Sequence, residues 1–201
     1  MKQFSNYDKA REAANFTATE KLPKGAYVCK VLNVKYENGI DGNSDMLLLQ
    51  IDVTEGEHKD FFKTQFDANT AEDKKWKGVV RIYVPKDDGS EQDQWTQNAF
   101  AKWIAAIEDS NANYTWDWDE KKLKNKILGV VFGETGTVIE GREIVYTEAR
   151  FGCSVDKVRE GKAPSAKFKA KNGYTGNGNT TTASAPAIPA PTNSTEDEIP
   201  F

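Results

Sequence analysis

The residue types at the C-terminus form a peptide that another protein could bind. The last six residues combine three acids, an aliphatic residue, a proline and a terminal phenylalanine: Glu196, Asp197, Glu198, Ile199, Pro200 and Phe201. The Phe201 ring can fill an apolar pocket while its α-carboxylate meets an arginine or backbone N–H groups, and Pro200 fixes φ so that less entropy is lost on docking. The three acids add attraction to a basic rim. We therefore predict a partner-docking tip rather than a tail that serves solubility alone.

Aromatic and cationic side chains also alternate in the body of the chain, in a pattern suited to nucleic acid. Proteins that bind single strands stack bases on aromatic rings and place cations along the phosphates. A predicted strand from Arg142 to Phe151 carries Arg142, Tyr146 and Arg150 on one face. Two guanidinium groups around a tyrosine make this face a candidate DNA contact, with core packing of the ring as the competing interpretation.

Two further sets share this chemistry. A predicted strand over Lys59 to Phe66 places Phe61 and Lys63 on one face. A predicted loop puts the Trp76 indole among three ammonium groups. The candidate DNA-binding residues are therefore Phe61, Lys63, Lys74, Lys75, Trp76, Lys77, Arg142, Tyr146 and Arg150.

Motifs for catalysis or metal binding are missing from the sequence. The chain has one histidine, His58, and two cysteines far apart, which do not make a zinc motif. The run Gly133 to Gly136 lacks the Gly-Lys-Ser/Thr ending of a phosphate loop. The run Asp41 to Asp45 resembles half of a calcium loop, but Met46 stands where glycine is required. We predict no enzyme activity, no cofactor and no metal; a nuclease is the weaker alternative.

Most of the elements that position these residues are predicted to be β-strands, because runs of apolar residues at period two are broken by turn residues. The second of them carries Leu47, Leu49, Ile51 and Val53 on one face. A glycine-rich loop, Gly133 to Gly141, is predicted to join the last two. The predicted strands are Ala26–Tyr36, Asp45–Glu55, Lys59–Phe66, Val79–Val84, Lys126–Phe132 and Arg142–Phe151.

One strong helix is predicted, from Ser90 to Glu108. Its apolar residues recur at four-residue spacing, at Trp95, Ala99, Trp103 and Ile107. Trp95 and Trp103 are therefore expected in the core. Trp116 and Trp118 alternate with acids, so we expect their indoles to pack against the body rather than to contact DNA.

Composition and charge divide the chain into a body and a tail. The chain has 201 residues and a formal net charge of −4, so any DNA surface must be a local basic patch on an acidic domain. Two cysteines within strand-like runs indicate buried thiols, and the lack of a signal peptide or a membrane span indicates a cytosolic protein. After about residue 161 apolar residues become scarce, which predicts disorder. The expected divisions are an N-terminal extension (1–21), a folded domain (22–161), a disordered linker (162–195) and the tip (196–201).

The element order and several short runs resemble known single-strand binders. Strands followed by one helix and two more strands suit an OB-fold, a five-stranded barrel with a helix between its third and fourth strands. The tip closely resembles the acidic tip of bacterial single-stranded-DNA-binding proteins. The body also resembles a family of phage-encoded single-stranded-DNA-binding proteins, through the runs Leu22–Tyr27, Met46–Ile51, Glu55–Asp60 and Lys126–Val131.

The chain departs from the plain form of that family by extra segments at Asp67–Lys77 and Ser110–Glu120. The resemblance implies a mainly β OB-fold domain that binds single-stranded DNA with little sequence preference during replication, recombination or repair. It also implies a homo-oligomer, recruitment of DNA-processing proteins through the tip, and no membrane partner. The alternative is an adaptor or inhibitor that mimics the tip to occupy such proteins without binding DNA, which the acidic body favours.

Overall fold

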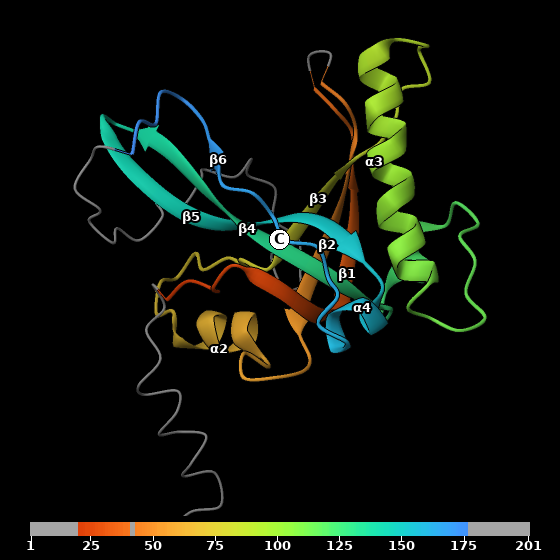
Figure 1. Cartoon of the computed structure of the whole chain (residues 1–201), viewed down its shortest axis with the longest axis horizontal. Helices are drawn as coiled ribbons and strands as arrows, with labels where there is room; N and C mark the ends of the chain where they lie inside the picture. The colour runs from red at the N-terminus through yellow and green to blue at the C-terminus, as the bar shows by residue number, and fades with distance from the viewer. Residues whose placement is uncertain (1–19, 41–42, 177–201) are drawn as a thin grey trace, which may run out of the picture.

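A computed structural model of the chain describes residues 20–40 and 43–176 (Figure 1). This part of the chain is mainly β, and its six strands form one sheet in the order β3-β2-β1-β4-β5, with β6 paired to β4. The elements are β1 (Gly25–Glu37), β2 (Met46–Val53), α2 (Phe61–Ala68), β3 (Val79–Tyr83), α3 (Glu91–Glu108), the 3-10 helix η1 (Glu120–Leu123), β4 (Ile127–Ile139), β5 (Arg142–Cys153), α4 (Val155–Arg159) and β6 (Lys169–Ala170).

The period-two pattern of β2 determines which face of the sheet forms the core. Leu47 pairs with Ile82 and Leu49 pairs with Val80 across the antiparallel β2–β3 ladder, and all four side chains are buried in one cluster. The strands predicted over Ala26–Tyr36, Asp45–Glu55 and Val79–Val84 are confirmed with small shifts at their ends. The expected buried thiols are also confirmed, since Cys29 and Cys153 are both free and buried.

The predicted strand over Lys59–Phe66 is wrong, because this segment forms helix α2. The carboxylate of Asp52, in β2, accepts hydrogen bonds from the backbone N–H groups of Phe62 and Lys63 at 2.9 and 3.0 Å. These donors belong to the first turn of α2, where N–H groups have no partner within the helix. A carboxylate 10 and 11 residues away from the two donors thus caps the helix, which local propensity could not reveal.

The predicted loop over Gly133–Gly141 is also wrong, because β4 continues to Ile139. The turn to β5 consists of Glu140 and Gly141 alone, both at positive φ (49° and 74°). Two central residues at positive φ are the signature of a tight hairpin whose twist matches that of its strands. The long β4–β5 hairpin therefore forms an arm that reaches away from α3 (Figure 1).

Helix α3 begins where the sequence predicts. The Ser90 hydroxyl accepts a hydrogen bond from the Asp93 N–H at 3.1 Å, as an N-cap does. The side chains that α3 buries follow helical spacing at Phe100, Trp103, Ile104 and Ile107. Trp103 is in the core as expected, but Trp95 is 64% exposed, so its predicted core position is wrong. The buried apolar stripe begins at Phe100, and Trp95 precedes it by more than one turn.

Part of the segment expected to be linker runs along the arm. Residues 162–176 include β6, which pairs in parallel with Thr135 and Gly136 of β4 beyond the point where β1 ends. The Lys171 N–H continues this contact by donating to the Gly136 carbonyl at 2.9 Å. The remaining linker, the tip and the N-terminal residues lie outside the described residues. No helix within residues 20–40 and 43–176 is long and apolar enough to cross a membrane.

Candidate nucleic-acid interface

Trp76 is a core residue, so its predicted role in stacking on a base is wrong. The side chain is only 5% exposed, and its indole N–H donates to the Ile51 carbonyl at 2.9 Å. Its ring also packs on Phe66, with 5.7 Å between ring centroids. The neighbouring Lys74 ammonium lies 4.5 Å from the centroid of the Phe66 ring. The loop therefore directs its indole inward, and its three lysines (Lys74, Lys75 and Lys77) surround no exposed aromatic ring.

Phe61 and Lys63 do not form a shared face either. Phe61 is 5% exposed and meets the Phe62 ring edge-on, with 5.4 Å between centroids. Lys63 lies on the exposed side of α2, where its ammonium pairs with the Asp67 carboxylate at 2.6 Å. Two residues separated by two positions point in different directions on a helix, whereas they share a face on a strand. The predicted pairing fails because α2 is helical.

Arg150 is engaged in a partly buried network on β5 rather than free for phosphate. Val131 pairs with Phe151 and Phe132 pairs with Ala149, so Arg150 is the extra residue of a β-bulge. Its guanidinium donates to the Thr135 hydroxyl at 2.6 Å and pairs with the Glu148 carboxylate at 3.0 Å.

Glu148 gathers several donors in the same network. Burial tends to raise its pKa, but the Thr135 hydrogen bond, Lys171 and Arg150 together hold the pKa of this carboxyl below its ordinary value. The Lys171 ammonium lies 3.3 Å from the carboxylate. Two cations therefore share one anion, which leaves the network with an excess of positive charge.

Arg142 and Tyr146 remain on β5 as predicted, but they do not form a compact site with Arg150. Arg142 is exposed beside the hairpin turn, and Tyr146 is half-buried opposite Thr135. Arg142 and Arg150 are eight residues apart, which is about 26 Å along a strand. The arm therefore offers separate contacts rather than a single cluster of a tyrosine between two arginines.

The sheet brings together a different aromatic and cationic surface, which we call the β3 face. It consists of Lys35 and Glu37 on β1, Met46 and Leu48 on β2, and Arg81 and Tyr83 on β3. In the ladders, Leu48 pairs with both Lys35 and Arg81, while Met46 pairs with Tyr83. These side chains point away from the core, because the alternate residues of β3 are the buried ones.

The β3 face carries cationic groups and is accessible at Arg81 and Tyr83, whereas Leu48 in its middle is only 5% exposed. Tyr83 is 58% exposed, and Arg81 is exposed as well. The Lys35 ammonium pairs with Glu37 at 3.0 Å, whereas within the described part of the chain the Arg81 guanidinium has no ion pair. An exposed phenol next to a guanidinium without a carboxylate partner is suited to stack a base and contact its phosphate.

Gln50 lies on β2 beyond Leu48 and has the same orientation. It is fully buried, and neither its amide nitrogen nor its amide oxygen has a hydrogen-bond partner among the described residues. A buried polar group without a partner is unfavourable by about 1–3 kcal/mol. Next to the β3 face, β2 thus carries a buried amide whose donor and acceptor both lack a hydrogen-bond partner among the described residues.

The sequence itself contains a local signal for the β3 face. In the run Val79 to Val84, Val80 and Ile82 alternate with Arg81 and Tyr83. In a strand this alternation buries the first pair and exposes the second on a single face. What the sequence lacks is the pairing with β1 and β2, which adds Lys35 and Leu48.

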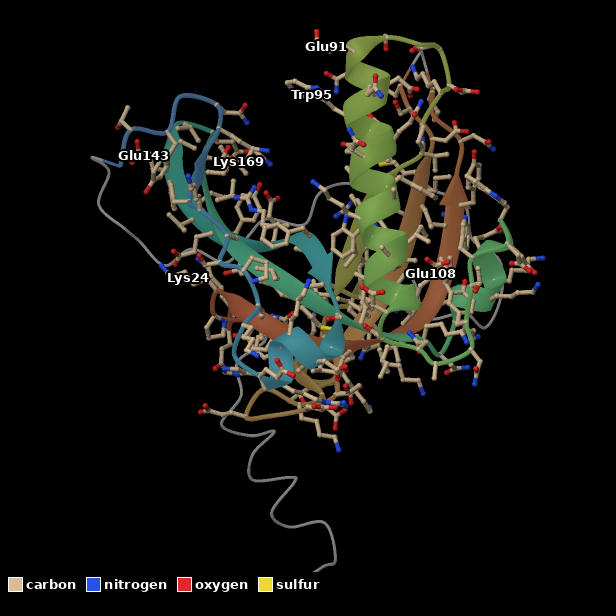
Figure 2. The ribbon with its side chains drawn as sticks, turned by 45° about the vertical axis from the view of Figure 1, so that its right-hand side comes forward. Lys24, Glu91, Trp95, Glu108, Glu143 and Lys169 are labelled. Atoms are coloured by element: carbon tan, nitrogen blue, oxygen red, sulfur yellow. The ribbon has the colours of Figure 1, made fainter. Side chains whose placement is uncertain are left out.

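A pocket lies where α3 meets β5. Its volume is about 410 Å³, and it is lined by Trp95, Asn98, Ala99, Lys102 and Trp103 of α3 and by Arg150 and Phe151 of β5. Figure 2 shows the Trp95 side chain extending from the outer turns of α3 on the side of the β4–β5 arm. The prediction of a buried Trp95 left this residue out of every candidate site.

Trp116 and Trp118 pack against α3, as expected. The Trp116 and Phe100 rings meet edge-on with 6.3 Å between centroids. The Trp118 ring lies parallel to the Phe100 ring at 6.1 Å and 7°, although Trp118 remains 76% exposed. Its backbone is at φ 66°, which is uncommon for a residue other than glycine.

No protein-family model matches the chain, and a search of curated proteins finds no match either. The resemblance to single-stranded-DNA-binding proteins, drawn from short runs of residues, therefore stays a prediction.

Proposed function

We propose that the chain binds single-stranded DNA with little sequence preference, and that the β3 face is the main contact. The observation that carries the proposal is the exposed Tyr83 beside Arg81, whose guanidinium has no ion pair among the described residues. Base stacking on an aromatic ring contributes about 1–3 kcal/mol per base and tolerates any sequence, because every base has a flat π-face. Arg81 and Lys35 would follow the phosphates on either side.

The arrangement of the strands supports an OB-fold as the finer description. Helix α3 lies between β3 and β4 in the chain, as in the five-stranded OB barrel, and β3 and β5 are the two outer strands of the order β3-β2-β1-β4-β5. An OB-fold would form if the sheet closed between β3 and β5. Helix α3 contacts both of these strands. OB-folds bind oligonucleotides over their second and third strands, which in this chain carry most of the β3 face.

The net charge of −4 is compatible with this proposal because only a local patch needs to be cationic. Each phosphate that a lysine or arginine neutralises releases condensed counterions, and log K then falls with log salt by about 0.7 per phosphate for single strands. Binding through the β3 face should therefore weaken as salt is raised, by a slope that reports how many cations take part.

Fluorescence anisotropy of labelled dT20 at two or more salt concentrations tests the proposal. Tyr83→Ala should weaken binding about tenfold with little change in salt slope, because it removes a stacking ring. Arg81→Ala should reduce the salt slope by about 0.7. Tyr146→Ala is the matched tyrosine variant on the arm; an effect of Tyr146→Ala without one of Tyr83→Ala would move the contact from the β3 face to β5.

The alternative, an adaptor or inhibitor that carries the tip and binds no DNA, makes the opposite prediction for the same titration. No salt-sensitive response at micromolar concentrations of the wild-type chain would exclude DNA binding and favour this alternative. In the proposed function the tip recruits DNA-processing proteins in the cytoplasm during replication, recombination or repair.

The tip has a test of its own. Removing Ile199 to Phe201 should abolish capture of partner proteins in a pull-down. It should leave DNA binding intact or slightly stronger, because the shortened acidic tail competes less with DNA for cationic surfaces. Unchanged recovery of partners would contradict this role. The described residues do not include the tip, so its role is proposed from the sequence alone.

A further inference from the structure

The pocket between α3 and β5 has features that the β3 face does not explain. Trp95, Ala99 and Lys102 lie at positions i, i+4 and i+7 of α3 and so share one side of the helix. Trp95 is 64% exposed although it is a large aromatic residue. Lys102 is exposed two turns further along, about 10 Å away along the helix axis. An indole and an ammonium are thus presented on one side, with the side chains of Asn98 and Ala99 between them.

The charges around this pocket favour an anionic occupant. Lys102 and Arg150 line it, and no carboxylate does so within the described residues. Arg150 is paired with Glu148, but Glu148 is also shared with Lys171 at 3.3 Å. Lys102 thus has no carboxylate beside it in the pocket lining, and Arg150 shares its carboxylate with Lys171, so a ligand that carries a phosphate or a carboxylate gains from the remaining positive charge.

The inner wall of the pocket is fixed by close packing. Trp103 is 6% exposed and lies against Gly152 of β5, where an added Cβ would be 2.7 Å from the Trp103 Cε3 atom. Only glycine allows this approach, so the distance between α3 and β5 is set by a contact that cannot relax easily. The exposed Trp95 ring is consequently held over a preformed opening rather than on a mobile loop.

A nucleotide fits this arrangement better than a peptide does. A peptide that adds to the outer edge of β5 needs a regular ladder of N–H and C=O groups, and the bulge at Arg150 interrupts that ladder. A nucleotide needs only a flat ring for its base and a cation for its phosphate. Trp95 and Lys102 supply these two groups at a separation of two helical turns.

We propose that the α3–β5 pocket is a second subsite for single-stranded DNA, in which a base stacks on Trp95 and a neighbouring phosphate pairs with Lys102. This inference rests on the proposed function, because it assigns an additional contact to the same ligand. A single-stranded DNA molecule bound to the β3 face reaches the pocket only if it is long enough. Short oligonucleotides should therefore use the β3 face alone, and longer ones should use both surfaces.

The test is a titration of the full-length chain with labelled oligo(dT) from dT4 to dT30. Trp95→Ala should weaken the binding of the longest oligonucleotides about tenfold and leave the shortest unaffected, whereas Tyr83→Ala should weaken binding at every length. Lys102→Ala should lower the salt slope by about 0.7 for long oligonucleotides only. Ala99→Glu, which adds bulk and a negative charge in the middle of the pocket, should reproduce the length-dependent loss.

Two matched variants control for general effects. Trp118→Ala removes another exposed indole, and Lys124→Ala removes another exposed ammonium, both outside the pocket and the β3 face. Neither should produce a length-dependent loss. Thermal denaturation of each variant identifies any loss that arises from unfolding.

The outcomes separate this inference from the proposed function. If the wild-type chain binds no oligonucleotide, the proposed function fails and the inference fails with it. If the wild-type chain binds oligo(dT) but Trp95→Ala, Lys102→Ala and Ala99→Glu match it at every length, only the second subsite is refuted. If the peptide Glu-Asp-Glu-Ile-Pro-Phe quenches tryptophan fluorescence in the wild-type chain but not in Trp95→Ala, and dT30 produces no such difference, the pocket binds acidic peptides and the inference is overturned.

Discussion

Replacing Trp76 by phenylalanine tests whether this indole belongs to the core or to a DNA surface. Trp76 is 5% exposed, and its N–H donates to the carbonyl of Ile51, a residue that is itself fully buried. Trp76→Phe leaves that carbonyl without this partner, which is unfavourable by about 1–3 kcal/mol. The smaller ring also leaves unfilled volume beside Phe66, which adds about 1 kcal/mol. The expected loss in the free energy of unfolding is therefore about 3 kcal/mol.

In a domain of this size 1 kcal/mol corresponds to about 2–4 °C, so the melting temperature should fall by about 6–12 °C. Calorimetry measures this change, and anisotropy with dT20 at 15 °C measures affinity while both proteins are folded. The affinity of Trp76→Phe should match that of the wild-type chain. Tyr83→Ala should show the reverse pattern, with reduced affinity and a stability within about 0.5 kcal/mol of wild type. An unchanged melting temperature with weaker DNA binding by Trp76→Phe would refute the reasoning from burial.

Three further substitutions test the packing that positions the candidate surfaces. Asp52 is 5% exposed, and burial raises its pKa to about 6 despite three backbone N–H donors. The stability that the protonated carboxyl contributes is complete below about pH 3.8 and is lost as the pH rises through 6. Urea unfolding should therefore show wild type losing about 2 kcal/mol relative to Asp52→Asn between pH 4 and pH 7. Gly152→Ala places a Cβ 2.7 Å from the Trp103 ring and should reduce stability by about 1–3 kcal/mol in thermal denaturation; an unchanged melting temperature would show that α3 can move away from β5. Lys63→Ala removes only an exposed pair with Asp67, so it should change neither stability by more than about 1 kcal/mol nor the affinity for dT20, and a tenfold loss of affinity would restore α2 as a DNA contact.

The sequence predicts most of the fold because the relevant signals are local. The alternation of Leu47, Leu49, Ile51 and Val53 predicts a strand with one buried face, and Ser90 predicts the start of α3 through its hydroxyl. The failures arise where a distant residue decides the local structure. The segment of Phe61 is a helix because Asp52 caps it from another strand, which a period-two reading of the segment cannot detect.

The candidate surfaces were harder to predict than the strands that carry them. From sequence, the lysines around Trp76 indicated a surface loop and the four-residue spacing of Trp95 indicated the core, and both predictions were wrong. The fold buries Trp76 under α2 and beside Ile51, and leaves Trp95 beyond the stripe through which α3 contacts the sheet. Similarly, the sequence places Arg81 and Tyr83 on one face, but only the pairing with β1 and β2 adds Lys35 and Leu48 to it.

By itself, then, the sequence determined that β1 to β5 exist, along with the capped helix α3, the buried thiols and the chemistry of the terminal six residues, because each depends on the order of neighbouring residues. The tertiary structure alone decided which aromatic rings are exposed and which cations have no carboxylate partner. The physical reason is that burial and ion pairing depend on what other parts of the chain bring to a face, as β1 brings Lys35 to Arg81 and as Gly152 brings β5 to Trp103.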